Sequence, residues 1–575
     1  MNGGQCIAAV LQRRGVRFLF ALCGGHISPI LVGCKRAGIR VVDVRNEATA
    51  VFAADAVARL TGIPGIAVVT AGPGVTNSVT AIVNARLAQS PLVVLGGATA
   101  TVLKNRGALQ DIDQLALIRS SVKWAARARR LRQLPELLEN ALWTAQQGVP
   151  GPVFVECPAD LLYDETVVRQ WYAARSTPRP GAGIGERAIA SYLRFHLDRQ
   201  FADAGVLPPP RPAPIAAEPS AAAADRAAAR LAQAQRPLLL IGSQALLDVE
   251  QVETLRAAAD RLAVPVYLSG MARGLLGPRH SLQLRHRRRQ ALRQADVVVL
   301  AGVTCDFRLD YGAHIGKDTC LISVNRSRRD LRLNRRPQIA AEADPARFLC
   351  ALARRFSAAD LRPWRETLAL SERGREDEID EQAAQPAERI NPLALCREIE
   401  ARLPDNAVIV ADGGDFIATA SYIIWPRGPL SWLDPGVYGT LGVGAGFALG
   451  AKLCRPQDEV WALFGDGAFG YGLAEFDTFK RHGVGIVGVV GNDACWSQIA
   501  REQVEFLRDD VGCALRYSDY HLAAQALGGR GMTIRQPAEI APALSAARAS
   551  AAQGMPVLIN ALIQRSEFRK GSISM

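Results

Sequence analysis

The stretch that decides the fold is Gly465-Asp466-Gly467-Ala468, which follows an apolar run and is followed further on by Gly491-Asn492-Asp493. The length of one helix plus one strand separates the two carboxylates, so a parallel α/β unit would bring both to the same edge of its sheet. Two carboxylates beside a glycine turn suit a hard divalent cation that holds a diphosphate. The sequence therefore predicts a Mg²⁺ site at Asp466 and Asp493.

The rest of the chain repeats the alternation of strand and helix. At 575 residues it is too long for one hydrophobic core. Short continuous runs of Val, Ile and Leu recur in three segments, which is typical of parallel sheets buried on both faces. We therefore expect three open, mostly parallel α/β domains. The expected bounds are 1–170 for the first domain, 171–220 for a Pro-rich linker with an inserted helix over 185–204, 221–356 for the central domain, 357–389 for a charged linker and 390–575 for the last domain with its tail. The expected strands are 18–22, 41–44, 66–70, 92–95 and 153–156, then 237–241, 264–267, 297–300 and 321–324, then 407–411, 459–464, 485–491 and 557–561.

Charge and cysteine usage narrow the class of protein. The net charge is +13, concentrated in runs such as Arg285–Arg289 and Arg326–Arg336. No aromatic interleaving or known nucleic-acid module accompanies these runs, so we expect no nucleic-acid partner. A solvated arginine face and a site for a multiply phosphorylated small molecule both remain open. The eleven cysteines are scattered without metal-ligand spacing, which predicts reduced thiols in a cytoplasmic protein. No segment is typical of a signal peptide or a membrane span.

The Gly-Asp-Gly motif, followed further on by Gly491-Asn492-Asp493, resembles the signature of thiamine-diphosphate enzymes. In that signature Asn-Asn stands where this chain has Asn492-Asp493. Asp493 departs from that pattern, because it keeps an oxygen ligand but adds a negative charge. With three α/β segments, the chain resembles acetolactate-synthase-like members over essentially its whole length. The resemblance implies thiamine diphosphate and Mg²⁺ as cofactors. ADP or FAD in the central domain is left open, because Gly242-Ser243 and Asn325 follow expected strands there.

The resemblance also implies which residues of the first domain act on the cofactor and substrate. Glu47 matches the family's glutamate, which acts on the pyrimidine ring, and Pro73 and Asn77 would line the pyrimidine pocket. Gln110 matches a glutamine near the reacting carbon. His26, in a loop after the first strand, could donate a hydrogen bond to a developing alkoxide or transfer a proton. The competing interpretation is structural for both residues. Glu47 would only favour the helix dipole from the first turn of its helix, and His26 would only support its loop.

In the last domain, the resemblance implies the site for the diphosphate and the metal. Leu441 would hold the cofactor bent, and the Mg²⁺ ligands would be Asp466, Asp493 and the main-chain oxygen of Cys495. The Cys495 thiol is not meant, because Mg²⁺ prefers oxygen. The expected cofactor contacts in this domain are Gly414, Asp415, Phe416, Gly439, Leu441, Gly465, Asp466, Gly467, Ala468 and Asp493.

Several segments favour one branch of the family. Met271-Ala272-Arg273-Gly274 resembles the central domain of oxalyl-CoA decarboxylases and 2-hydroxyacyl-CoA lyases, and Gly24–Pro29, Val51–Ala56, Gly491–Asp493 and Gly571–Ser574 resemble the lyases. The basic tail Phe568–Met575 could close over a substrate. The resemblance implies a carbon–carbon lyase that cleaves 2-hydroxyacyl-CoA to formyl-CoA and an aldehyde or ketone, and that also catalyses the reverse acyloin condensation.

Other interpretations stay open at this point. One is an acetolactate-synthase-type carboligase or decarboxylase of 2-oxo acids. Another is an inactive regulatory or oligomerisation subunit, which the presence of Glu47, Asp466 and Asp493 disfavours. The family also implies a homodimer or homotetramer, because one subunit supplies the glutamate and its partner supplies the diphosphate site.

Overall fold

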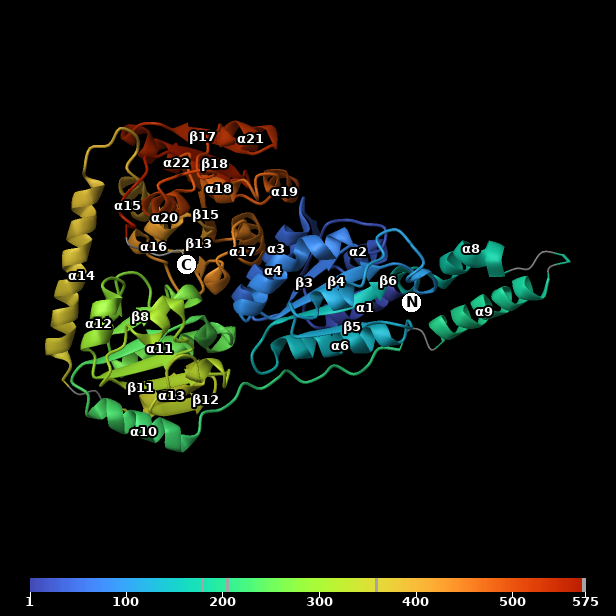
Figure 1. Ribbon diagram of the computed structural model, residues 1–575, viewed down its shortest axis with the longest axis horizontal. Helices are drawn as coiled ribbons and strands as arrows, with labels where there is room; N and C mark the ends of the chain where they lie inside the picture. Colours follow the sequence, from blue (N-terminus) through green and yellow to red (C-terminus); the bar gives the residue numbers. More distant parts are fainter. Residues whose placement is uncertain (177–179, 182, 203–205, 357–359, 571–575) are drawn as a thin grey trace. The chain divides into compact units, whose positions relative to one another are not determined.

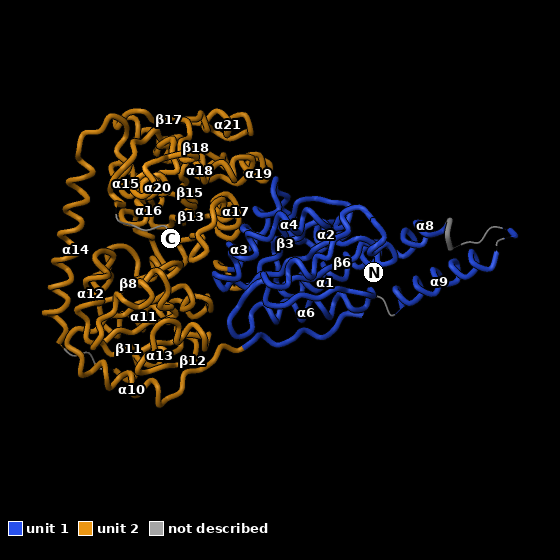
Figure 2. The backbone as a smooth tube through the Cα atoms, viewed as in Figure 1, with its two compact units in different colours: residues 1–58, 63–214 blue, residues 59–62, 215–575 orange. Residues whose placement is uncertain are grey.

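The computed structural model describes residues 1–176, 180–181, 183–202, 206–356 and 360–570. They form two compact units, residues 1–58 with 63–214 and residues 59–62 with 215–575 (Figure 2). The first unit contains one six-stranded sheet and the second contains two (Figure 1). Every strand pair in the three sheets is parallel. The expected fold class of three parallel α/β domains is thus confirmed.

The sheet of the first unit has the strand order β2-β1-β3-β4-β6-β5. Its central strands are buried along their whole length, because helices cover both faces of the sheet. The strands are β1 (Phe18–Ala21), β2 (Arg40–Asp43), β3 (Gly65–Val69), β4 (Leu92–Ala98), β5 (Trp124–Arg127) and β6 (Pro152–Pro158). The helices are α1 (Gly3–Arg13), α2 (Ser28–Arg36), α3 (Glu47–Thr61), α4 (Pro73–Leu87), α5 (Gln114–Ile118), α6 (Gln133–Gln146), α7 (Ala159–Leu162), α8 (Glu165–Ser176) and α9 (Ile184–Phe201), with the short η1 (Thr101–Leu103).

The first sheet of the second unit has the order β12-β11-β10-β7-β8-β9, which is the order of doubly wound nucleotide-binding sheets. Its strands are β7 (Pro237–Ile241), β8 (Val266–Leu268), β9 (Gln283–Leu284), β10 (Val297–Ala301), β11 (Cys320–Asn325) and β12 (Ile339–Glu342). The helices are α10 (Ala221–Ala232), α11 (Val252–Leu262), α12 (Arg288–Gln294) and α13 (Pro345–Arg355), with η2 (Ser243–Leu246), η3 (Val249–Gln251), η4 (Gly270–Ala272), η5 (Phe307–Gly312) and η6 (Asp330–Arg332). The long α14 (Arg362–Ala383) then leads to the next sheet.

The last sheet has the order β14-β13-β15-β16-β18-β17. Numbered from its own first strand, this is the same order as in the first unit. The strands are β13 (Ala407–Ala411), β14 (Trp432–Leu433), β15 (Glu459–Gly465), β16 (Val487–Asn492), β17 (Arg530–Ile534) and β18 (Val557–Leu562). The helices are α15 (Pro392–Arg402), α16 (Asp415–Ile423), α17 (Val443–Cys454), α18 (Asp466–Phe469), α19 (Glu475–His482), α20 (Ser497–Leu507), α21 (Tyr520–Ala526) and α22 (Ile540–Ala552), with η7 (Gly436–Tyr438) and η8 (Pro537–Glu539).

The strand orders show where each sheet can bind a ligand. In a doubly wound sheet, ligands bind beyond the carboxyl ends of the strands, where the strand order reverses. That reversal lies between β1 and β3 in the first unit, and between β13 and β15 in the last sheet. The loops that follow these four strands carry His26, the segment 70–74, the segment 412–414 and Asp466.

The structure corrects some of the expected elements. All thirteen expected strands are present with small shifts at their ends, but β5, β9, β12, β14 and β17 were not expected, and each of them is short or lies at an edge of its sheet. The inserted helix is present as α9, and it is preceded by a further helix, α8, that the linker interpretation missed. The charged linker is mostly the continuous helix α14. Part of the expected tail, Gly571–Met575, lies outside the described residues.

The cysteines lie mainly in the core. Eight of the eleven are buried, Cys350 and Cys454 are partly exposed, and Cys23 is exposed. All eleven lie in the described part of the chain and are free thiols. Among the described helices, none is long and apolar enough to cross a membrane.

Candidate active site

In the first unit, Glu47 begins α3 and is nearly buried, with a relative exposure of 5%. Its Oε2 accepts a hydrogen bond of 3.1 Å from the side-chain amide of Asn77 on α4. An exposed glutamate that only favours the helix dipole would need neither burial nor this partner. Burial and the hydrogen bond from Asn77 therefore fix the position of the Glu47 carboxyl group.

The loop between β3 and α4 also approaches Glu47, which follows β2, although β1 lies between these two strands in the sheet. Gly72 has φ 61° and ψ −106°, which requires glycine, and it is followed by Pro73 at the start of α4. A Cβ on Gly74 would lie 3.6 Å from Glu47 Oε1. Pro73 and Asn77 are both exposed on the surface of this unit. The predicted pyrimidine contacts are thus brought together with Glu47 and remain accessible to a ligand.

A buried glutamine that the sequence analysis did not identify fixes this loop. Gln114 Oε1 accepts a hydrogen bond of 2.8 Å from the Gly72 backbone N–H, and its Nε2 donates one of 3.1 Å to the Gly97 carbonyl. Gln114 therefore ties the loop after β3 to the end of β4. Gln110 also lies against this loop, because a Cβ on Gly72 would be 2.9 Å from the Gln110 carbonyl oxygen.

His26 also lies at the reversal point of this sheet. Its Nδ1 is 3.3 Å from the Thr70 hydroxyl, and Nε2 has no hydrogen-bond partner within the described part of the chain. Burial lowers the pKa of His26 below its ordinary value, so the neutral imidazole is favoured. The structure thus brings Glu47, His26, Pro73, Asn77 and Gln110 to one edge of one sheet.

In the second unit, β15 and β16 end side by side and bring Asp466 and Asp493 together. Asp466 is 3% exposed, and its Oδ2 is buried without a hydrogen-bond partner. Burial and then the neighbouring Asp493 raise the pKa of Asp466 to about 7. Burial likewise raises the pKa of Asp493 to about 6, against the hydrogen bond from Ser497. A divalent cation would compensate these charges, so the donor set fits Mg²⁺.

The conformation of the segment after β16 is constrained by its backbone and by close packing. Ala494 has φ 54°, a left-handed conformation that is strained for a residue with a Cβ. Cys495 pairs with Ala514 in an isolated antiparallel bridge, which fixes the backbone that carries the predicted carbonyl ligand. A Cβ on Gly467 would lie 2.3 Å from the ring of Trp496, so only glycine fits there.

The remaining predicted contacts also lie at the carboxyl edge of this sheet. Gly414 has φ 110°, and a Cβ on Gly413 would lie 2.2 Å from Leu441 Cδ2. Asp415 begins α16, and its carboxylate forms an ion pair of 2.8 Å with Arg501, a partner that the sequence analysis missed. Phe416 packs on Gly491, while Gly439 is an exposed glycine with φ 63°. The glycines leave backbone accessible at the carboxyl edge, as a diphosphate site requires.

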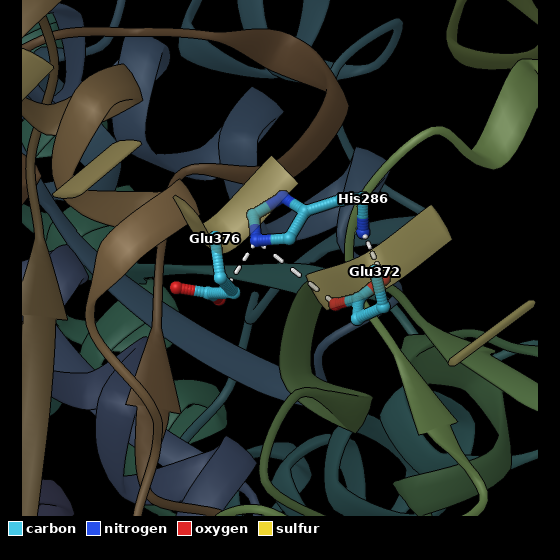
Figure 3. Close-up of side chains that lie close together, drawn as sticks. All are labelled: His286, Glu372 and Glu376. Carbon is cyan, nitrogen blue, oxygen red and sulfur yellow. Dashed lines mark hydrogen bonds and ion pairs between the residues drawn. The ribbon is translucent and has the colours of Figure 1, made fainter. Parts of the chain in front are cut away.

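The second unit also contains a polar cluster formed by His286, Glu372 and Glu376 (Figure 3). His286 Nε2 is 2.9 Å from Glu376 Oε1 and 3.9 Å from Glu372 Oε1. Glu372 already accepts the backbone N–H groups of Arg285 and His286, and Glu376 pairs with Arg397 at 2.7 Å. These partners satisfy the carboxylates, so the cluster joins α14 to the β9 segment as an ion-pair network.

Comparison with known proteins identifies the family. Residues 1–117, 224–352 and 412–561 match, respectively, the N-terminal TPP binding domain, the central domain and the C-terminal TPP binding domain of thiamine pyrophosphate enzymes. The chain therefore belongs to the thiamine pyrophosphate enzyme family, and its fold and site support a thiamine-diphosphate-dependent enzyme.

Individual relatives narrow the branch. The chain is 50% identical over 586 residues to 2-hydroxyacyl-CoA lyase 2 of Bos taurus and 49% identical over 583 residues to that of Homo sapiens. Each alignment covers 100% of this chain and 92% of the relative. A probable acetolactate synthase of Mycobacterium bovis is 35% identical, with 98% of this chain and 96% of the relative covered. The resemblance to this family and to its lyase branch is confirmed.

Proposed function

We propose that the chain is a thiamine-diphosphate- and Mg²⁺-dependent 2-hydroxyacyl-CoA lyase. It cleaves a 2-hydroxyacyl-CoA to formyl-CoA and an aldehyde or ketone, and it catalyses the reverse condensation. The observation that carries the substrate class is a cavity of about 360 Å³ in the second unit. It is lined by Arg273, Arg285, Arg287, Arg288, Arg289 and His314, together with Tyr267, Gln283, Ser421 and Tyr422 and the apolar residues Leu268, Leu284, Ile424 and Pro426.

The charged side chains that line this cavity are arginines, so its charge is positive. No carboxylate is among its lining residues in the described part of the chain. Burial lowers the pKa of Arg285 to about 10, although Glu376 opposes this shift, and burial also lowers the pKa of Arg273 and Arg288. Burying several guanidinium groups together is costly unless an anion joins them. Of the two interpretations of the arginine run, the structure favours a site for a phosphorylated small molecule.

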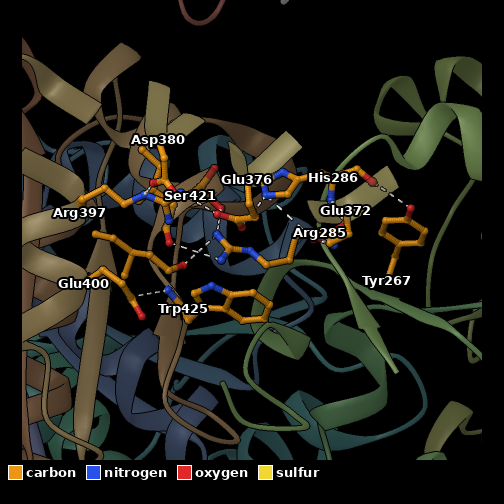
Figure 4. A network of polar contacts seen from close by, with 12 residues as sticks. Tyr267, Arg285, His286, Glu372, Glu376, Asp380, Arg397, Glu400, Ser421 and Trp425 are labelled. Atoms are coloured by element: carbon orange, nitrogen blue, oxygen red, sulfur yellow. Dashed lines mark hydrogen bonds and ion pairs between the residues drawn. The ribbon is translucent and has the colours of Figure 1, made fainter. Parts of the chain in front are cut away.

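The contacts of Arg285 leave this role open to it. Arg285 donates to the Ser421, Ile423 and Ile424 carbonyls only at 3.3–3.5 Å, and it lies 4.1 Å from the ring centroid of Trp425 (Figure 4). Arginine that is held over an aromatic ring keeps its planar N–H fork available for phosphate. The Tyr422 ring also lines the cavity and stacks with His286 at a centroid distance of 6.0 Å.

The C-terminal segment borders the same cavity. Phe568 packs edge-on against Tyr422 at 5.9 Å, and the Arg569 guanidinium lies 4.7 Å from the Tyr422 ring centroid. We infer that this segment contributes to the acyl-CoA site, as the basic tail suggested. Together, the arginines of this cavity match the three phosphates of a coenzyme A ester.

In this proposal, bound thiamine diphosphate supplies a carbon nucleophile that also serves as an electron sink. Asp466, Asp493 and the Cys495 carbonyl would hold Mg²⁺, and the glycines at 413–414 and 465–467 would admit the diphosphate. Glu47 would hold a proton at the pyrimidine nitrogen. During cleavage the C1–C2 bond breaks, His26 takes the proton of the substrate hydroxyl, and a proton is returned to the carbon that becomes the formyl group.

We do not include ADP or FAD in the proposal. The strand order of the central sheet reverses between β7 and β10, where a nucleotide would bind. There a Cβ on Gly242 would lie 2.5 Å from the Gly302 carbonyl oxygen, and Gln244 donates to Asn325 at 3.0 Å. Ser243 Oγ accepts the Met271 N–H at 3.0 Å and Asn325 is 1% exposed, so all three predicted contact residues already have contacts within the protein.

The substrate class can be tested by comparing two thioesters of the same acid. A 2-hydroxyacyl-CoA carries the phosphates, whereas the corresponding pantetheine thioester lacks them. Arg288→Gln should lower kcat/KM about tenfold or more for the CoA ester and leave the pantetheine ester within about twofold. The matched control is Arg362→Gln, since Arg362 is an exposed arginine paired with Asp360. An equal effect on both thioesters, or none on either, would show that the cavity does not bind the phosphates.

The reaction class needs a separate assay. Formyl-CoA with formaldehyde should give glycolyl-CoA, while pyruvate alone should give little acetolactate. The opposite result would favour the acetolactate-synthase-type carboligase. We also propose a homodimer or homotetramer, because the family resemblance implies that one subunit supplies Glu47 and its partner supplies the diphosphate site. The free thiols support the cytoplasm as the proposed location. Sedimentation that shows an active monomer would contradict the assembly.

A further inference from the structure

Asp412 is a buried carboxylate with an unusual set of partners. It follows β13 at the reversal point of the last sheet and is 3% exposed. Its Oδ1 accepts the Gly442 N–H at 2.8 Å, and its Oδ2 accepts the Gly444 N–H at 2.9 Å. The Val443 N–H also contributes a hydrogen bond. One carboxylate thus holds consecutive backbone amides at the start of α17.

These amides belong to the segment that carries Leu441. Gly439 and Gly442 on either side of Leu441 have φ 63° and 85°, so the backbone around Leu441 is conformationally permissive. Leu441 is only half-buried, and it packs on Gly413, the residue after Asp412. The position of this apolar side chain therefore depends on contacts with residues 412 and 413.

The partners of Asp412 are all N–H donors, which suit a carboxylate. A carboxylate offers two oxygens and can accept all three N–H groups, whereas the amide of asparagine has one acceptor oxygen. The N-terminus of α17 also favours negative charge. Burial opposes ionisation and raises the pKa of Asp412 to about 7, so the contact has a desolvation cost that a surface cap would not have. Such a cost is expected where a protein must hold a backbone segment, here the start of α17, in one conformation.

We propose that Asp412 is a positioning residue that fixes the segment 440–444 and thereby presents Leu441 to the thiazolium side of bound thiamine diphosphate. This inference rests on the cofactor use stated in the proposed function, but it does not depend on which substrate is cleaved. Asp412 itself does not contact the reacting atoms in this scheme.

Two variants of the full-length protein test the proposal. In Asp412→Asn without cofactor, hydrogen exchange measured by mass spectrometry should become at least about tenfold faster for the backbone amides of residues 442–444. Thiamine diphosphate should bind about tenfold more weakly, and the circular dichroism bands of its aminopyrimidine tautomers should change in the bound state. Asp412→Glu keeps the charge and should restore part of each property.

The matched control is Asp344→Asn. Asp344 is also a buried carboxylate, 1% exposed, that caps a helix of the same unit by accepting the Arg347 N–H at 2.9 Å. This variant should lower the melting temperature comparably, yet leave exchange at 442–444 and the cofactor spectrum unchanged.

Wild-type exchange at 442–444 in Asp412→Asn, together with unchanged cofactor affinity and spectrum, would overturn the proposal. If Asp412→Asn does not fold, the same measurements on Asp412→Glu test the proposal. Wild-type values for exchange, affinity and spectrum in that variant would again overturn the proposal. Failure of wild-type protein to cleave acyl-CoA would refute the proposed function alone, because exchange in the cofactor-free protein does not depend on that activity.

Discussion

Asn77 donates its side-chain amide to Glu47 at 3.1 Å, and the two residues lie on helices that follow different strands of one sheet, with Glu47 at the start of α3 and Asn77 in the second turn of α4. The contact fixes a buried carboxyl group beside a loop whose backbone only glycine can adopt. We expect Glu47→Gln to leave folding and cofactor affinity nearly unchanged, because the amide keeps the shape. Turnover should fall about 100-fold or more, since an amide cannot transfer the proton. A fall of less than about tenfold, or roughly 1.4 kcal/mol, would exclude the catalytic role.

Asp493 can be tested by a pair of substitutions. Asp493→Asn retains an oxygen ligand and the chance of a hydrogen bond with Ser497, so activity at saturating Mg²⁺ should stay within about threefold. Asp493→Ala removes the ligand and should raise the Mg²⁺ concentration for half-activity at least about tenfold, with weaker thiamine diphosphate binding. Titration calorimetry measures both affinities. If both variants are equally impaired, Asp493 acts in some way other than metal ligation.

His26 should govern the acidic limb of the pH profile. Its pKa lies below the ordinary value of about 6.5 because the side chain is partly buried. The neutral form needed to accept a proton is therefore dominant at pH 7 and is lost only as the pH falls through the lowered pKa. His26→Gln cannot titrate but can still bond to Thr70, so it should lower kcat at least about tenfold and remove this limb. An unchanged limb in the variant would assign it to another group.

Gln114 should be a stabilising and positioning residue of the first unit. Gln114→Leu leaves the buried Gly72 N–H and Gly97 carbonyl unpaired, at a cost of about 1–3 kcal/mol for each group. We expect a clearly lower free energy of unfolding for this unit and weaker thiamine diphosphate binding. The control is Gln133→Leu, where the glutamine accepts the Arg129 and Arg130 N–H groups near the surface. Equal losses in the two variants would argue against a special role for Gln114.

The sequence predicts the central strands well and the edge strands poorly. Strands such as 92–98 and 297–301 are continuous apolar runs because both of their faces are covered. By contrast, β17 (Arg530–Ile534) and β5 (Trp124–Arg127) are partly exposed edge strands whose composition is not distinctive. The helix α14 was taken for a linker because its surface is rich in charge and only a few of its residues are buried.

The residues of the candidate site likewise divide into those that the sequence predicts and those that it does not. Glu47 and Asp466 stand in local motifs, so their roles can be inferred from neighbouring residues. Gln114, Arg501 and the anchoring role of Asp412 depend on partners 17 to 86 positions away along the chain, and no local pattern marks them. The arginine cavity is intermediate, because the run at 285–289 is visible in the sequence while its closure by Ser421 and Tyr422 is not.

The uneven burial of the cysteines gives the chain a built-in labelling site. Cys23 is the exposed cysteine, and it lies three positions before His26, whereas Cys157 and Cys396 have pKa values raised by burial and resist modification. A thiol-reactive fluorophore should therefore attach first at the loop after β1. Its emission would then report events in the loop that carries His26, without any engineered residue. By the same chemistry, bulky alkylating agents that react at Cys23 should inhibit the enzyme.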